Sequence, residues 1–142
     1  MLMHKSLMLH LLCSVFVCVV GFCISAKSQN ADSGPFVLVA NQGGRTLSIL
    51  SVSAGTQIAA VSEGDITGHE VAASPDGKTA YVPIYGNSGV GKPGTNGTHI
   101  VVIDIASHKV TGNIDLGHGA RPHCIIYNKK DNLLYVTTEL DK

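Results

Sequence analysis

The chain has 142 residues, and its 10 Lys or Arg residues balance its 10 Asp or Glu residues, so the formal net charge is zero. This balance leaves no basic stripe for nucleic acid and no acidic tail, so we expect no nucleic-acid partner. Trp is absent and aromatic residues make up only 5% of the chain. Frequent Gly, Ser, Thr and Asn between short β-branched runs are typical of an all-β protein.

The first 26 residues have the three-part pattern of a secretory signal peptide. A short basic start precedes an apolar run over residues 7–24, and the small residues Ser25 and Ala26 close that run. A retained membrane anchor is the alternative, because the run approaches the length that spans a bilayer. We favour cleavage, since no basic cluster follows the run. We therefore expect a signal peptide (1–26), a linker (27–35), and a periplasmic or extracellular protein without membrane association after cleavage.

Three of the four cysteines lie in the apolar run, so the mature chain keeps only Cys124. A single cysteine cannot form an internal disulfide, even in an export compartment that would permit one. We expect Cys124 to be a small buried residue on a strand, with a reactive thiol as the alternative.

Short apolar runs bounded by turn residues follow the linker, and no window after residue 26 has helical periodicity. In the tight turn over residues 41–44, Gly43 and Gly44 are expected to supply positive φ. A second turn is expected at Pro75-Asp-Gly77, and a glycine-rich loop at 86–97. The predicted strands are 36–40, 47–52, 57–61, 71–74, 79–84, 100–105, 110–114, 124–127 and 133–138.

Part of the chain occurs twice. Residues 69–83 align without a gap onto residues 123–137, with His over His and Tyr-Val over Tyr-Val, and residues 100–117 lie over residues 47–64. Such self-similarity indicates stacked supersecondary units. Each complete unit contains four short antiparallel strands, which is the pattern of a β-propeller blade.

The second unit carries a family resemblance. Ser74-Pro-Asp-Gly-Lys-Thr-Ala-Tyr-Val82, followed by Ile100-Val-Val-Ile-Asp-Ile105 and a Gly-terminated strand, resembles the YVTN-type β-propeller repeat. That repeat occurs in secreted propellers and in relatives of lactonase-type enzymes, and the resemblance covers nearly all of residues 36–142. It implies a partial propeller of about two and a half blades. The predicted units are a first blade lacking its innermost strand (36–67), a second blade (68–120) and the first half of a third (121–142).

A propeller needs four or more blades of about 40–45 residues to close. We therefore expect the sequence to be a truncated or partial product of a longer propeller, with assembly of fragments into a ring as the alternative. Uncovered blade faces and open strand edges would also let such a fragment associate with itself.

Two histidines share one position in the repeat. His69 and His123 are each expected to begin an innermost strand, and these strands line the central channel of a propeller and gather at one mouth of it. Imidazole, carboxylate and guanidinium groups that converge there could bind an anion or move a proton. Alternatively, these residues only satisfy backbone groups where blades meet. The candidate ligand-binding residues are His69, Glu70, His118, Arg121 and His123.

Other motifs give no site. No histidine pair has the close spacing of a zinc motif such as His-Glu-x-x-His, and no metal or cofactor is expected. The run from Gly86 to Gly91-Lys92 imitates a phosphate-binding loop, but Pro93 replaces the required hydroxyl residue and a strand follows instead of a helix. This stretch is expected to be a long surface loop that could gate one face.

Two functions remain open from the sequence. The first is a secreted binding or scaffold module that presents a rigid face to a small-molecule, glycan or protein ligand at the channel mouth. The alternative, which the resemblance implies, is a lactonase-like hydrolase that opens a cyclic ester there. In that case His69 or His123 would be the general base, and Arg121 would stabilise the developing oxyanion. We favour binding over catalysis, because propellers host many unrelated functions.

Overall fold

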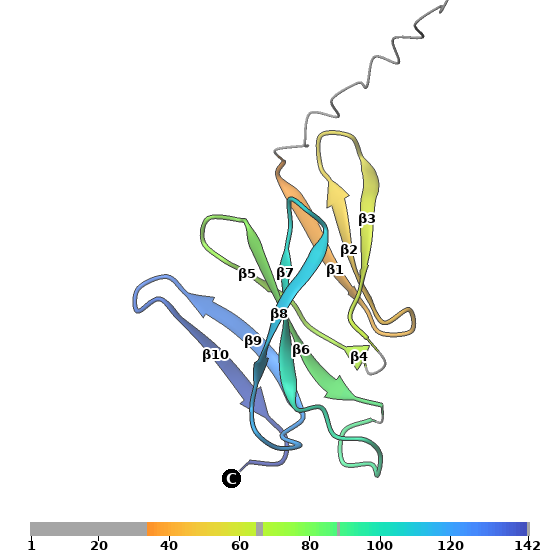
Figure 1. The fold of residues 1–142 in the computed structure, drawn as a ribbon, viewed down its shortest axis with the longest axis vertical. Helices are drawn as coiled ribbons and strands as arrows, with labels where there is room; N and C mark the ends of the chain where they lie inside the picture. The colour runs from red at the N-terminus through yellow and green to blue at the C-terminus, as the bar shows by residue number, and fades with distance from the viewer. Residues whose placement is uncertain (1–33, 65–66, 88, 142) are drawn as a thin grey trace, which may run out of the picture.

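The computed structural model describes residues 34–64, 67–87 and 89–141, and these residues form an all-β fold of small antiparallel blades (Figure 1). The signal peptide predicted for residues 1–26 lies outside the described residues, as does the linker up to residue 33. No helix in the described part of the chain is long and apolar enough to cross a membrane.

The strands are arranged in three sheets. The first sheet has the order β1 (Phe36–Asn41), β2 (Thr46–Ser51), β3 (Thr56–Ser62). The second sheet contains β4 (Thr67–Gly68), β5 (Ala72–Ala73), β6 (Thr79–Gly86), β7 (His99–Asp104) and β8 (Lys109–Asp115), with β4 and β5 both paired to β6. The third sheet is the hairpin of β9 (Pro122–Asn128) and β10 (Leu133–Thr138).

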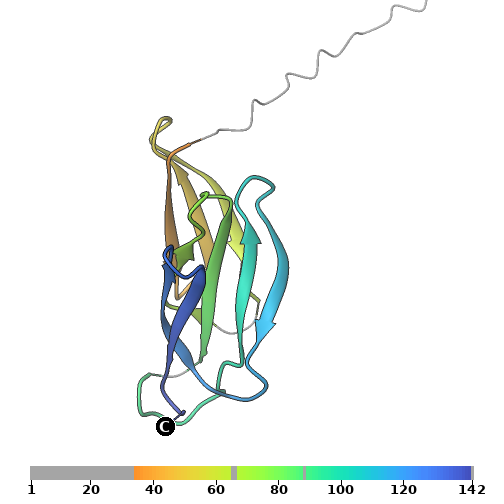
Figure 2. The same ribbon diagram turned by 90° about the vertical axis from the view of Figure 1, so that its left-hand side faces the viewer.

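The sheets are stacked in series, with the second between the first and the third (Figures 1 and 2). Alternation along each strand sends successive side chains to opposite faces. One face of the second sheet packs against the first sheet in a closed apolar core. The buried members of this core are Leu47, Ile49, Val61, Ala80, Val82, Ile84, Val101, Ile103 and Ile105. The opposite face contacts the third sheet, where the rings of Tyr81 and Tyr127 lie 6.0 Å apart.

Four hairpins use the same loop geometry. Each has a four-residue loop whose last residue has positive φ, between +52° and +65°. These residues are Arg45, Gly55, His108 and Asn132. The prediction that Gly43 and Gly44 supply positive φ is therefore wrong. The Gly44 N–H donates to the Asn41 carbonyl at 3.1 Å, which closes a turn over residues 41–44. The residue with positive φ is Arg45, which follows that turn.

The innermost strand of the second sheet is interrupted. Only β5 lies within the predicted strand 71–74; β4 precedes it, and the two pair with β6 on either side of a gap. His69 lies in this gap and does not begin a strand, whereas His123 lies within β9. Pro83 of β6 lies opposite the gap and has no amide hydrogen to donate to a ladder, which accounts for the interruption.

Cys124 is exposed, and the prediction that it is buried is wrong. Its neighbour Ile125 is buried. Alternation along β9 therefore places Cys124 on the opposite face of the third sheet, which no described strand covers.

Candidate functional site

Three aromatic rings meet where the second and third sheets come together. Tyr85 near the end of β6 is buried, and it lies on the same face of β6 as Tyr81, toward the third sheet. The centroid of its ring is 4.9 Å from that of His69 and 5.3 Å from that of His123. The two imidazole centroids are 5.5 Å apart. The repeat thus places its two histidines in one cluster, with Tyr85 packed against both.

The environment of His69 favours the neutral imidazole. Partial burial lowers the pKa of His69, the nearby His123 lowers it further, and the charge of Glu70 opposes these effects. The side-chain amide nitrogen of Gln42, in the β1–β2 turn, lies 3.4 Å from His69 Nε2. The imidazole tautomer decides the direction of this contact, and Nε2 accepts from the amide when Nδ1 carries the proton. A neutral His69 has one unprotonated nitrogen and can therefore accept a proton.

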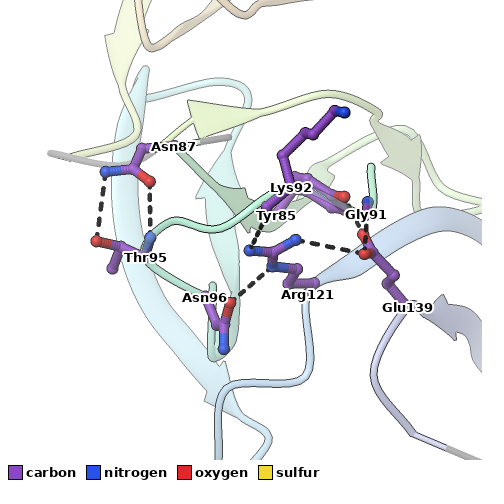
Figure 3. A network of polar contacts seen from close by, with 8 residues as sticks. All are labelled: Tyr85, Asn87, Gly91, Lys92, Thr95, Asn96, Arg121 and Glu139. Atoms are coloured by element: carbon purple, nitrogen blue, oxygen red, sulfur yellow. Dashed lines mark hydrogen bonds and ion pairs between the residues drawn. The ribbon is translucent and has the colours of Figure 1, made fainter. Parts of the chain in front are cut away.

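The buried guanidinium of Arg121 holds several segments together (Figure 3). Its Nε donates to Asn96 Oδ1 at 2.7 Å, and its Nη2 donates to the Lys92 carbonyl at 2.8 Å. Its Nη1 lies 3.3 Å from Glu139 Oε1 in an ion pair. The same guanidinium lies 5.6 Å from the centroid of the Tyr85 ring, within range of a cation–π contact. Arg121 thus connects the glycine-rich loop to the segment after β10.

Glu139 is the second centre of this network. The Tyr85 hydroxyl donates to its Oε2, and the Gly91 N–H donates to its Oε1 at 2.9 Å. These bonds, together with Arg121, lower the pKa of the Glu139 carboxyl. Burial and the neighbouring carboxylate raise the pKa of the Tyr85 hydroxyl. At neutral pH Glu139 is therefore ionised, Tyr85 keeps its proton, and the charge of Arg121 is matched within the protein.

The loop between β6 and β7 is closed at its base by hydrogen bonds. The Gly97 N–H donates to the Tyr85 carbonyl at 2.8 Å, and the Arg121 N–H donates to the Gly97 carbonyl at 3.0 Å. A Cβ at Gly97 would lie 1.5 Å from the Ile84 carbonyl oxygen, so only glycine fits there. Further up the loop, the Asn87 Oδ1 accepts from the Thr95 N–H at 2.7 Å (Figure 3).

A shallow pocket of about 460 Å³ lies where this loop meets the segment after β10. Both views place the chain end beside the loop (Figures 1 and 2). The residues lining the pocket include Lys92, Pro93, Asn96, Arg121, Glu139 and Leu140.

The predicted site residues have different surroundings. His69, His123 and Arg121 gather around Tyr85, and Glu70 is close enough to influence His69. His118 is exposed: its Nε2 lies 2.6 Å from Asp141 Oδ1 and its Nδ1 lies 3.0 Å from the Leu116 carbonyl. Asp141 and that carbonyl raise the pKa of His118. His118 thus has polar partners of its own.

Sequence reasoning missed Tyr85, Glu139 and Asn96. Tyr85 could have been found, because the alternation of Tyr81, Pro83 and Tyr85 places all three on one face of a strand. Glu139 gives no such signal, since it follows the last repeated strand. Across the described residues no group of three His, Cys, Asp or Glu side chains is arranged to hold a metal ion.

No protein-family model and no curated protein sequence matches the chain. Among solved structures, it is similar to a chain of hydrazine synthase from Kuenenia stuttgartiensis, with a TM-score of 0.56 and 22% identity over 72% of this chain. The match spans 28% of that chain's length. A likeness at this identity concerns the fold alone.

Proposed function

We propose that the chain is part of an exported β-propeller of the YVTN-repeat type that binds a small ligand beside His69, Tyr85 and His123. The repeated sequence, the three antiparallel sheets stacked in series and the basic-then-apolar N-terminal pattern support this proposal. A rigid scaffold that positions a few side chains at one edge is a common basis for ligand binding.

The observation that carries the proposal is the cluster of His69, Tyr85 and His123. Its rings come from two sheets and lie within 5.5 Å of one another. Imidazole N–H groups donate hydrogen bonds, and the partly exposed rings of His69 and His123 can stack on a flat ligand, while the buried Tyr85 packs behind them. The charge of Arg121 is already matched by Glu139. We therefore favour a neutral, carbonyl-bearing ligand over an anionic one.

A matched pair of probes tests this ligand class. The purified chain is titrated with δ-valerolactone and, separately, with 5-hydroxyvalerate, the anion that forms when this lactone is hydrolysed. The imidazole Cε1–H resonances are followed by NMR and assigned with His69→Gln and His123→Gln. We expect the lactone to shift the signals of these two histidines at concentrations where the anion does not. His108, which is exposed in the β7–β8 turn, is the internal control.

Equal shifts at His108 would mean that the lactone binds without selectivity, and the proposed site would then be wrong. A response to the anion alone would overturn the choice of a neutral ligand. Loss of the lactone response in both His69→Gln and His123→Gln, with unchanged thermal melting at pH 7.5, is the result we expect.

Lactone hydrolysis is a second candidate, and the lowered pKa of His69 favours it. A neutral imidazole can take a proton from water as that water attacks the ester carbonyl; when the ring C–O bond breaks, the imidazolium returns this proton to the leaving alkoxide, which gives the hydroxy acid and regenerates the imidazole. In this reading Arg121 would stabilise the oxyanion, although three of its N–H groups already contact Asn96, Lys92 and Glu139. Conversion of the lactone above the buffer rate, abolished by His69→Gln, would establish the hydrolase.

A further inference from the structure

Two sheet faces at opposite ends of the stack are apolar and exposed. On the third sheet, Ile126 and Tyr135 are cross-strand partners, and Leu133 lies on the same face. On the first sheet, Val37 and Val39 point away from the core into which Phe36 and Leu38 pack. The five exposed side chains are between 39% and 58% accessible. We call these surfaces the third-sheet face and the first-sheet face.

The third-sheet face has a counterpart inside the chain. The repeat aligns Tyr135 with Tyr81. Tyr81 lies on the face of the second sheet that packs against the third, with its ring 6.0 Å from that of Tyr127. The third-sheet face therefore has the same position in its unit as a face that already packs on a neighbouring sheet.

The first-sheet face also corresponds to a face that is packed inside the chain, namely the face of the second sheet that packs against the first. The repeat aligns Ser48 with Val101, and Val101 belongs to the core through which the second sheet packs against the first. Ser48 is the cross-strand partner of Val39, so both lie on the first-sheet face. The two exposed faces thus correspond to the two sides of an interface that joins consecutive sheets within the chain.

The strand pairing at the edge of the first sheet is a second observation that favours association. Among the described strands β1 pairs only with β2, whereas β6, the equivalent strand of the second sheet, also pairs with β4 and β5. The first sheet therefore presents an open backbone edge next to its exposed face, and such edges favour association.

We propose that the third-sheet face of one copy packs against the first-sheet face of a second copy, head to tail. The internal packing supplies the argument for this occupant, because each exposed face complements a sheet of this repeat and the chain itself carries both. The contact is heterologous, so it leaves one face free at each end and can continue into a longer assembly or a ring. It involves neither His69 nor His123 and stands apart from the ligand site.

A complementation experiment distinguishes this contact from a symmetric one. Val39→Asp blocks the first-sheet face and Ile126→Asp blocks the third-sheet face. Each variant alone retains only one competent face, so we expect each to be a monomer by light scattering after size exclusion. Mixed in equal amounts, the two variants still have one intact face of each kind. We expect the mixture to show twice the monomer mass, with one copy of each variant confirmed by mass spectrometry after cross-linking.

The unsubstituted chain is expected to form species at least as large as a dimer, and so is Val52→Asp, a control at an exposed position in the β2–β3 turn. Circular dichroism establishes that each variant is folded. If a variant is unfolded, Val37→Lys replaces Val39→Asp, and Tyr135→Lys replaces Ile126→Asp. A monomeric unsubstituted chain, a single blocked variant that still assembles, or a folded mixture that remains monomeric would each overturn the proposal.

Discussion

The two interfaces between consecutive sheets share a geometry and differ in chemistry. The interface between the first and second sheets is almost wholly apolar, with Leu47, Ile49 and Ile103 among its buried members. The interface between the second and third sheets contains imidazole and phenol rings and, at one end, the ion pair of Arg121 with Glu139. The repeat therefore specifies how the sheets stack and leaves the polarity of each contact open, which lets function differ within one fold.

The polar groups at the two interfaces also differ in how well they are satisfied. Arg121 makes three side-chain hydrogen bonds to protein acceptors. Glu63, beside the apolar core, accepts one hydrogen bond from the Gly68 N–H at 3.0 Å, and its buried Oε1 has no partner among the described residues. A buried polar atom without a partner lowers stability, whereas a satisfied network adds to it.

The largest effect is expected in the apolar interface. Ile49→Ala removes three carbons from a fully buried position and should lower the free energy of unfolding by about 2–5 kcal/mol. Val52→Ala, at an exposed turn position, should change it by less than about 0.5 kcal/mol. Urea unfolding followed by circular dichroism measures both. Equal values for the two variants would show that the apolar cluster does not hold the first two sheets together.

The next effect tests the polar interface. Arg121→Met keeps much of the side-chain volume but leaves the acceptors on Asn96 and Lys92 without their donor. We expect a loss of about 2 kcal/mol in the free energy of unfolding, in the range for hydrogen bonds to a charged group. Proteolysis should also become faster within the loop between β6 and β7, which Arg121 contacts.

The control for this prediction is Lys129→Met, which removes a charge from an exposed turn position and should leave both measurements unchanged. Arg121→Lys keeps the charge and loses the planar fork, so it should fall between the two. Wild-type stability in Arg121→Met, with unchanged loop proteolysis, would show that the network is incidental.

The sequence predicted most strands and the turn at Pro75-Asp-Gly77, because these depend on local chemistry. In that turn the Ser74 hydroxyl donates to Asp76 Oδ1 at 2.6 Å, and the Lys78 N–H donates to the same oxygen at 3.1 Å. The repeat alignment paired His69 with His123, whose rings lie 5.5 Å apart. Periodicity and internal comparison are sufficient for such features.

The remaining features depend on long-range contacts. The hydrogen bond from Tyr85 to Glu139 joins residues 54 positions apart, and no local pattern announces it. The left-handed conformation of Arg45 follows from how the turn before it closes, and composition pointed to the adjacent glycines instead. The gap at His69 arises from Pro83, a residue on a different strand. The Tyr85–Glu139 hydrogen bond and the gap at His69 are set by tertiary context that overrides local preference, whereas Arg45 is set by the closure of its own turn.

The third prediction concerns Glu63. Burial raises the pKa of its carboxyl, and the bond from Gly68 only partly opposes this. Because the folded state binds the proton more tightly, the stability this group contributes is fully present below about pH 4.5 and is lost as the pH rises through the folded-state pKa. Glu63→Gln keeps the shape without the charge and should raise the free energy of unfolding at pH 7 by about 1 kcal/mol.

The check is urea unfolding of both proteins at pH 4 and pH 7. Glu63→Gln should gain at pH 7 and differ little at pH 4. A loss of stability at pH 7 would instead mean that the ionised carboxylate has a favourable partner in the folded chain.

The smallest expected effect is the opposite pH dependence of the stability that His69 and His118 contribute. Burial and His123 lower the pKa of His69, so the folded state resists protonation there and loses stability as the pH falls below about 6.5. The pKa of His118 is raised, chiefly by Asp141. Its contribution is present below about pH 6.5 and is lost as the pH rises through the folded-state pKa. The two contributions therefore have opposite signs and partly cancel in the unsubstituted chain.

Single substitutions uncover this cancellation in melting temperatures measured at pH 5 and pH 7.5. His69→Gln should make the chain relatively more stable at pH 5, because the neutral amide removes the cost of protonating a partly buried ring. His118→Asn should make it relatively less stable at pH 5, because the charged bond to Asp141 is lost. Shifts of the same sign in both variants would contradict the assignment. Opposite shifts would locate the acid-sensitive group at the interface between the second and third sheets, where the proposed ligand would meet a neutral imidazole.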